Sequence, residues 1–109
     1  SLRKTAMSQA LKTASLVPLK VAGQSVRIFK FSRLMLERGN KNAATDAMVS
    51  ALAARTAAIG ALLNVRINLH SIHDPEFVRT TLEEVLRLET LTNEQEKEIT
   101  EIGYQLLNQ

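Results

Sequence analysis

The longest run of apolar residues extends from Asn42 to Leu69 and contains one glycine and no proline. Its apolar residues fall on every side of a helical wheel, which is typical of a helix surrounded by other protein or by lipid. A membrane span needs about 20 apolar residues without charges. Polar residues interrupt this run at Asp46, Arg55, Asn64, Arg66 and Asn68. The pattern therefore predicts a central helix, buried on all sides by the rest of the chain, and no contact with membrane.

The polar and small residues of this helix are not scattered. At about 100° per residue, six of them lie within about 40° of one line, and these are Asp46, Ala53, Ala57, Gly60, Asn64 and Asn68. Buried amides and charges need partners. One interpretation is that the amides bond to neighbouring helices, while the small residues allow close packing. The other is a polar pocket along one face. Arg55 and Arg66 form a second stripe on the opposite side and should also have partners.

The remaining apolar spacing predicts four further helices. Residues 2–17 form the first, and Pro18 should break or kink the chain there. The second covers residues 19–38 and ends at a left-handed Gly39. Asp74-Pro75-Glu76 starts the fourth, and Thr92 caps a fifth that buries Ile99, Ile102 and Leu106. No segment alternates as a strand does, so we predict an all-α, multihelical bundle of about five helices around the long central one.

Composition limits the domain organisation and the redox chemistry. A chain of 109 residues is long enough for one domain with a modest core. The absence of cysteine excludes disulfides and thiolate metal sites, and it suits a cytoplasmic location. The sequence begins at Ser1 in what already reads as mid-helix. We therefore expect residues 1–109 to form a single helical domain that is the C-terminal part of a larger one.

Charge is distributed unevenly along the chain. Residues 1–45 contain nine basic residues and one acid, whereas residues 71–109 contain three basic residues and nine acids. Such asymmetry occurs in nucleic-acid-binding proteins. Here the basic residues lie on several helical faces, without interleaved aromatic residues or a recognition motif. We predict no nucleic-acid partner. Attraction of a small anion, or of the acidic end of a second subunit, explains the asymmetry equally well.

Motifs for metal or nucleotide chemistry are missing. His70 and His73 lie three residues apart with Asp74 beside them and could suggest a metal site, but no further ligands follow at a familiar spacing. The chain contains no P-loop, dinucleotide fingerprint or nucleophile elbow. We predict no metal. Without any resemblance, the residues support only a helical domain with a polar line along its central helix.

One ordered set of short segments resembles a known family. The segment ASLVPLKVA, from Ala14 to Ala22, resembles the "A…VPL…A" helix of the cyclodeaminase domain of formiminotransferase-cyclodeaminase and of bacterial methenyltetrahydrofolate cyclohydrolases. The similarity continues through Gly39-Asn40, Thr45-Asp46 and GALLNVRINL at residues 60–69, and it closes with IHDPEF at residues 72–77. It covers about residues 5–80, and the N-V-x-I-N-L core with correct gaps carries most of its specificity.

Two features depart from the family pattern. The glycine-rich P-G-G-G-S-type segment of the family's first helix, associated with the folate site, does not occur in this sequence. His70 stands where relatives often have a basic residue. We expect the glycine-rich portion to belong to a preceding part of the domain or to a separate fragment, so that half of the site is outside this chain.

The resemblance implies chemistry on a tetrahydrofolate derivative as substrate, in a homodimer. A cyclodeaminase converts 5-formiminotetrahydrofolate to 5,10-methenyltetrahydrofolate and ammonia, and a cyclohydrolase opens the methenyl ring with water. Both reactions need proton transfer and a stabilised tetrahedral carbon. The resemblance makes Asp46 the candidate catalytic residue and Asn64, Asn68 and Arg66 the candidate substrate-binding residues. The alternative is a non-catalytic helical domain of the same family that serves dimerisation or folate binding, in which Asp46 is a structural residue.

Overall fold

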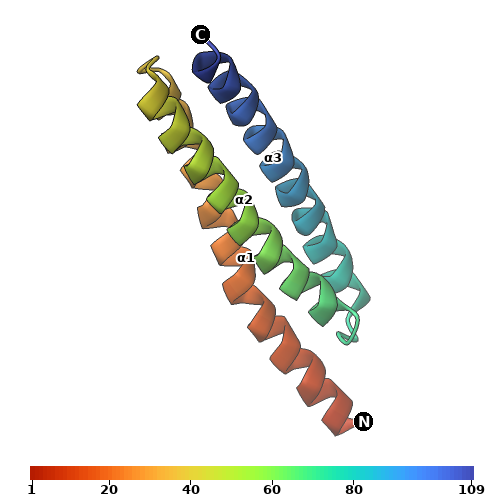
Figure 1. The fold of residues 1–109 in the computed structure, drawn as a ribbon. Helices are drawn as coiled ribbons and strands as arrows, with labels where there is room; N and C mark the ends of the chain where they lie inside the picture. The colour runs from red at the N-terminus through yellow and green to blue at the C-terminus, as the bar shows by residue number, and fades with distance from the viewer.

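The computed structural model describes residues 1–109 as three long helices and no strand. They are α1 (Leu2–Leu36), α2 (Lys41–Leu69) and α3 (Pro75–Leu107). Successive helices run antiparallel and form an elongated bundle of 63 × 17 × 16 Å (Figure 1). The N-terminal turns of α1 extend past the connection between α2 and α3 (Figure 1). The all-α class predicted from the sequence is confirmed.

A seam of small residues joins α1 to α2. Five buried residues of α1 recur every seven positions, at Ser8, Ser15, Ala22, Phe29 and Leu36, and Ser25 and Ser32 are buried between them. In α2 six of the seven buried alanines recur at alternating steps of three and four, at Ala44, Ala47, Ala51, Ala54, Ala58 and Ala61. This spacing keeps one face of each helix against its partner along the whole length. Because serine and alanine are short, the two backbones approach closely, and large side chains are few in this core.

The helix ends follow the sequence signals. Asn40 caps α2 and accepts a hydrogen bond from the Ala43 N–H at 2.8 Å. Gly39 before it has a φ of 72°, a conformation that costs glycine little. Asp74 caps α3 by accepting from the Phe77 N–H at 3.1 Å, with Pro75 in the first turn. The predicted start of the central helix was therefore wrong by one residue only.

The predicted number of helices was wrong, because two of the predicted breaks do not occur. Pro18 lies inside α1, which continues through it to Leu36. Thr92 is fully buried in the middle of α3 and caps nothing. In both helices the buried residues continue along one face across the expected break. The packing of that continuous face against the other helices outweighs the local tendency of Pro18 or Thr92 to end a helix. Of the residues expected to be buried by the last helix, Ile99 is buried, whereas Ile102 is exposed.

The prediction that α2 is buried on all sides was also wrong. Its two neighbours cover one side of it, and large apolar side chains on the other side are exposed. The exposed fractions are 60% for Val49, 57% for Leu63 and 65% for Ile67. By length and composition alone α2 could cross a membrane, a criterion that core helices of soluble proteins also meet. The absence of membrane contact stays a prediction.

Candidate functional site

A groove between α1 and α2, on the side away from α3, contains the amides of the polar line. Its volume is about 670 Å³, within the range of small-molecule sites. It is larger than the polar hollow of about 260 Å³ near the start of α1. Ten residues line it: Ala14, Val17, Pro18, Val21, Thr56, Ala57, Gly60, Ala61, Asn64 and Asn68. The part of the polar line from Ala57 to Asn68 therefore faces a groove open to solvent, and the prediction that the line is buried was wrong.

Asn64 and Asn68 lie on successive turns of α2 and share this groove. Asn68 donates through Nδ2 to the Ser15 hydroxyl in a long hydrogen bond of 3.5 Å. That hydroxyl in turn donates to the Leu11 carbonyl at 2.9 Å. In this orientation the Asn68 carbonyl oxygen remains available as an acceptor. Asn64 is exposed and makes no side-chain hydrogen bond within the chain, so both its donor and acceptor groups are available.

Pro18 adds an acceptor that sequence reasoning missed. Proline has no N–H, so within a continuous helix the carbonyl of the residue four positions earlier loses its partner. That residue is Ala14, which lines the groove together with Pro18. The sequence signal was present, because the apolar spacing continues across Pro18. A helix break at Pro18, as predicted from the sequence, would leave no such carbonyl, whereas the continuous helix does.

Asp46 does not join the two amides within one chain. It lies on the same face of α2 as Asn64, because eighteen residues make five complete turns. The same eighteen residues place it about 27 Å away along the helix axis. Its side chain is exposed and is absent from the groove lining. A ligand held between Asn64 and Asn68 cannot also place its reacting atoms against this carboxylate of the same chain.

Arg66 lies on the opposite side of α2, against α3. It donates two hydrogen bonds to the Glu89 carboxylate, from Nε at 2.9 Å and from Nη2 at 2.5 Å. These bonds raise the pKa of Arg66 above its ordinary value. Arg55, on the same stripe, donates through Nε to the side-chain oxygen Oδ1 of Asn93 at 2.9 Å. The arginine stripe thus has the partners that its pattern predicted, and its position separates Arg66 from the groove.

The histidines and Asp74 form part of the α2–α3 connection. Asp74 accepts a hydrogen bond from Lys12 Nζ at 2.5 Å, and this bond, with the helix-capping N–H of Phe77, lowers the pKa of its carboxyl. The His73 backbone N–H donates to the Ser8 hydroxyl at 2.8 Å. The chain contains no group of three or more histidine, cysteine, aspartate or glutamate side chains that could hold a metal ion.

The chemistry of the groove follows from its lining. Apolar walls from α1 and small residues from α2 suit a flat ring, while two amides and a free carbonyl offer donors and acceptors along one edge. None of the ten lining residues titrates. The groove can therefore bind and orient a neutral, hydrogen-bonding heterocycle. Any proton transfer must involve a group from outside this lining.

Comparison with known proteins places this region in a family context. Residues 1–87 match the family model described as formiminotransferase-cyclodeaminase. Formimidoyltransferase-cyclodeaminase from Gallus gallus is 36% identical over 86 residues, which are 79% of this chain and 16% of that protein. The methenyltetrahydrofolate cyclohydrolase of Methylorubrum extorquens is 32% identical over 83 residues, 76% of this chain and 40% of that protein.

A third relative, formimidoyltransferase-cyclodeaminase from Rattus norvegicus, is 33% identical over 79 residues, covering 72% of this chain and 15% of that protein. The chain therefore spans less than half the length of each of these relatives. All elements of the groove, from Ala14 to Asn68, lie within the matched region.

Proposed function

Because the chain belongs to the formiminotransferase-cyclodeaminase family, we propose that its α1–α2 groove binds a one-carbon derivative of tetrahydrofolate. The observation that carries the proposal is the shared groove of Asn64 and Asn68, the two amides of the N-V-x-I-N-L segment. The pterin ring is flat, with donors and acceptors at its edge. The Asn68 carbonyl oxygen and the freed Ala14 carbonyl accept from N–H groups, and Asn64 both donates and accepts.

The proposed reaction is that of a cyclodeaminase or of the related cyclohydrolase. In the first, N10 attacks the formimino carbon and forms a new C–N bond. With the formimino nitrogen already protonated, the N10 proton moves to that nitrogen, the C–N bond to it breaks with its electron pair, and ammonia leaves behind the positively charged methenyl compound. In the second, water adds to the methenyl carbon, the bond from that carbon to N5 breaks as N5 takes one of the water protons, the other proton is released, and the 10-formyl compound forms. Both pass through a tetrahedral carbon bearing groups that a nearby amide can orient.

The role of this chain in either reaction is to bind and orient the substrate. Asn64 projects from a rigid helix, which is a precise platform for a small ligand. The groove lining supplies no acid or base. We therefore propose that the proton-transfer group comes from another part of the assembled site. Asp46 stays a candidate for this role only if a second chain brings its carboxylate to the groove, as the expected homodimer would allow.

Matched glycine variants test the binding site. At both Gly60 and Gly23, no atom beyond the adjoining residues and the helix's own backbone lies within 4 Å of the position a Cβ would take, so alanine at either should stabilise its helix by about 1 kcal/mol. Gly60→Ala places its methyl group in the groove, whereas Gly23→Ala does not. Titration with tetrahydrofolate, followed by calorimetry, should show weaker binding for Gly60→Ala alone. Equal affinities for the two variants would contradict the proposed site.

Asn64→Ala and Asp46→Ala separate the proposed roles. Loss of one amide bond to the ligand should weaken tetrahydrofolate binding by about tenfold, with little change in the unfolding midpoint because Asn64 is exposed. Asp46→Ala should leave binding unchanged, and it should reduce turnover in an active assembly only if the carboxylate moves the proton.

Light scattering gives the oligomeric state directly. Binding without turnover by the complete assembly would favour the non-catalytic alternative.

A further inference from the structure

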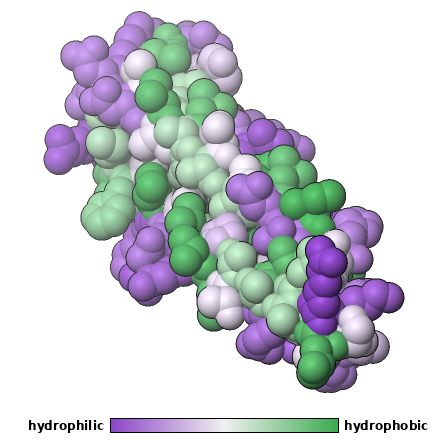
Figure 2. All heavy atoms as spheres, turned by 90° about the horizontal axis from the view of Figure 1, so that it is seen from below, coloured by the Kyte–Doolittle hydropathy of each residue, from purple (hydrophilic) through white to green (hydrophobic).

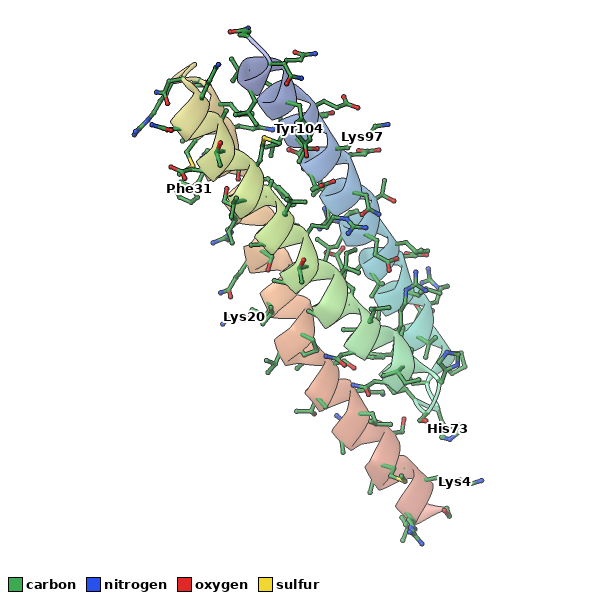
Figure 3. All side chains as sticks on the ribbon, in the orientation of Figure 1. Lys4, Lys20, Phe31, His73, Lys97 and Tyr104 are labelled. Carbon is green, nitrogen blue, oxygen red and sulfur yellow. The ribbon has the colours of Figure 1, made fainter.

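A polar hollow lies between the first turns of α1 and the α2–α3 connection. Its volume is about 260 Å³, and all seven residues that line it are polar, including Lys4, Ser8, Lys12 and His73. Pockets for drug-sized ligands begin at roughly 300 Å³, so this hollow suits a small ion. Lys4 and His73 lie on the same side of the N-terminal turns of α1 (Figure 3). The hollow thus differs in kind from the apolar surface of the bundle, which Figure 2 shows as a stripe with hydrophilic residues on both sides.

The Ser8 hydroxyl brings an unused hydrogen-bond donor to this hollow. Ser8 is only 5% exposed, and its oxygen accepts from the His73 backbone N–H at 2.8 Å. A hydroxyl also has one hydrogen to donate. The buried Ser15 and Ser25 donate theirs to the carbonyl four residues earlier in α1, whereas Ser8 donates to no atom of the chain. Because a buried donor without an acceptor is costly, the Ser8 O–H indicates a ligand oxygen in the hollow.

Two ammonium groups flank that hydroxyl. Lys4, Ser8 and Lys12 are four residues apart, so they stand on successive turns of α1, about 6 Å apart along the axis. Lys12 gives one of its three N–H donors to Asp74 at 2.5 Å, and its ammonium lies 5.4 Å from the centroid of the Phe77 ring. Lys4 is exposed and makes no ion pair. One carboxylate therefore balances only one of the two cations, and the remaining positive charge attracts anions.

We propose that this hollow binds a phosphate group, either as the free ion or as the monoester of a small molecule. A phosphomonoester carries a charge of about −1.5 to −2 at pH 7 and three acceptor oxygens, which can meet the Ser8 hydroxyl and the ammonium groups of Lys4 and Lys12 together. Its oxygens point in several directions and suit donors on successive turns, whereas those of a carboxylate lie in one plane. Lys12 is already held in place by Asp74, so little side-chain freedom is lost when it binds.

The phosphate site is separate from the proposed folate site. Ser8 lies about 120° around α1 from Ala14 and about 9 Å from it along the axis, so the hollow and the groove face different sides of this helix. No residue lines both of them. The proposal therefore goes beyond the proposed function, and its test contains no folate.

Titration of the ¹⁵N-labelled protein with sodium phosphate at constant ionic strength, followed by NMR, tests the proposal. The expected result is a saturable shift of the His73 backbone amide. Its N–H donates to the Ser8 hydroxyl, and that bond strengthens when the hydroxyl itself donates to phosphate. Sodium chloride should not reproduce the shift. A parallel titration with glycerol 3-phosphate distinguishes the two sources, because tighter binding than that of inorganic phosphate indicates a monoester and weaker binding indicates the free ion.

Two variants and a matched control locate the site. Lys4→Gln removes one exposed ammonium and should weaken phosphate binding about fivefold. Lys20→Gln removes another exposed, unpaired ammonium about 24 Å farther along α1 and should leave the affinity unchanged. Ser8→Ala removes a hydrogen bond to a charged ligand and should weaken binding about tenfold. It also removes the partner of the His73 N–H, so circular dichroism checks that this variant folds.

Three results would overturn the proposal. A shift that does not saturate, or that chloride reproduces, would show general screening of surface charge. Equal weakening by Lys4→Gln and Lys20→Gln would show that net charge, rather than the hollow, attracts phosphate, and this comparison decides the matter if Ser8→Ala does not fold. Unchanged affinity of a folded Ser8→Ala protein would show that the hydroxyl does not donate to the ligand.

Discussion

Pro18→Ala separates the cost of the proline to the helix from its use in the groove. Pro18 is half-buried inside the continuous helix α1. Its ring supplies no N–H, so the Ala14 carbonyl has no helical partner. Alanine restores that hydrogen bond. We therefore expect the variant to be more stable than the natural sequence while it binds tetrahydrofolate less tightly, because the freed acceptor is lost.

The magnitude follows from three contributions. Proline in a helix interior is about 3 kcal/mol less favourable than alanine. Proline also lowers the conformational entropy of the unfolded chain, so its removal stabilises the unfolded state by about 0.4 to 1 kcal/mol. Loss of the half-buried ring surface against the groove removes about 1 kcal/mol more. The net stabilisation should be about 1 to 2 kcal/mol, which is a rise in Tm of about 4 to 8 °C for a domain of this size.

Urea unfolding followed by circular dichroism measures this change, and an unchanged m-value would show that the exposed surface on unfolding is the same. Val21→Ala is the control, because it shortens the same wall of the groove without altering a backbone hydrogen bond. Equal or lower stability of Pro18→Ala would refute the reasoning, since it would show that the Ala14 carbonyl is already satisfied. Unchanged tetrahydrofolate affinity would remove the carbonyl from the proposed site.

Three further substitutions test the packing and the electrostatics of the bundle. The pKa of Asp74 is lowered mainly by Lys12. The stabilisation from the ionised Asp74 carboxylate is therefore complete above the unfolded carboxyl pKa of about 3.9, and it is lost as the pH falls through the lower folded value. Asp74→Asn keeps the helix cap and should make the free energy of unfolding less dependent on pH in this acid range. A Cβ on Gly103 would overlap the Met48 side chain, so Gly103→Ala should destabilise the protein by about 1 to 2 kcal/mol. In a Met48→Ala background the same substitution should stabilise it. Urea unfolding of the unmodified chain, the two single variants and the double variant would show both effects. The buried Thr92 hydroxyl has no hydrogen-bond partner, and Thr92→Val should raise the unfolding free energy by about 1 kcal/mol; a decrease would indicate that the hydroxyl is satisfied by bound water.

Local signals in the sequence predicted the ends of α2 and the start of α3 because they depend on nearby atoms only. Asn40 and Asp74 cap helices through a hydrogen bond three residues away. The same local reading failed at Pro18 and Thr92. There the buried faces of α1 and α3 continue across the signal, and contacts between helices distant in sequence decide the outcome. Such contacts are not visible in a single window of sequence.

The candidate site was predicted in part for the same reason. Helical periodicity correctly grouped Asn64 with Asn68, and it correctly assigned Arg66 a partner on the opposite side. It also placed Asp46 on the line of the amides, because angle around a helix carries no information about the distance along it. Apolar residues on all sides of α2 were interpreted as burial within this chain. The exposed side chains of Val49 and Ile67 instead leave one side of the helix available to a ligand or partner.

The most direct test of the account is a titration of the ¹⁵N-labelled protein with tetrahydrofolate, followed by NMR. The account predicts that the largest shift changes fall on the side-chain amides of Asn64 and Asn68 and on the backbone amides of Val21 and Gly60, which line the groove from its two helices. Changes confined to the polar hollow around Lys4, or no changes at saturating ligand, would contradict the proposal that the α1–α2 groove is the folate site.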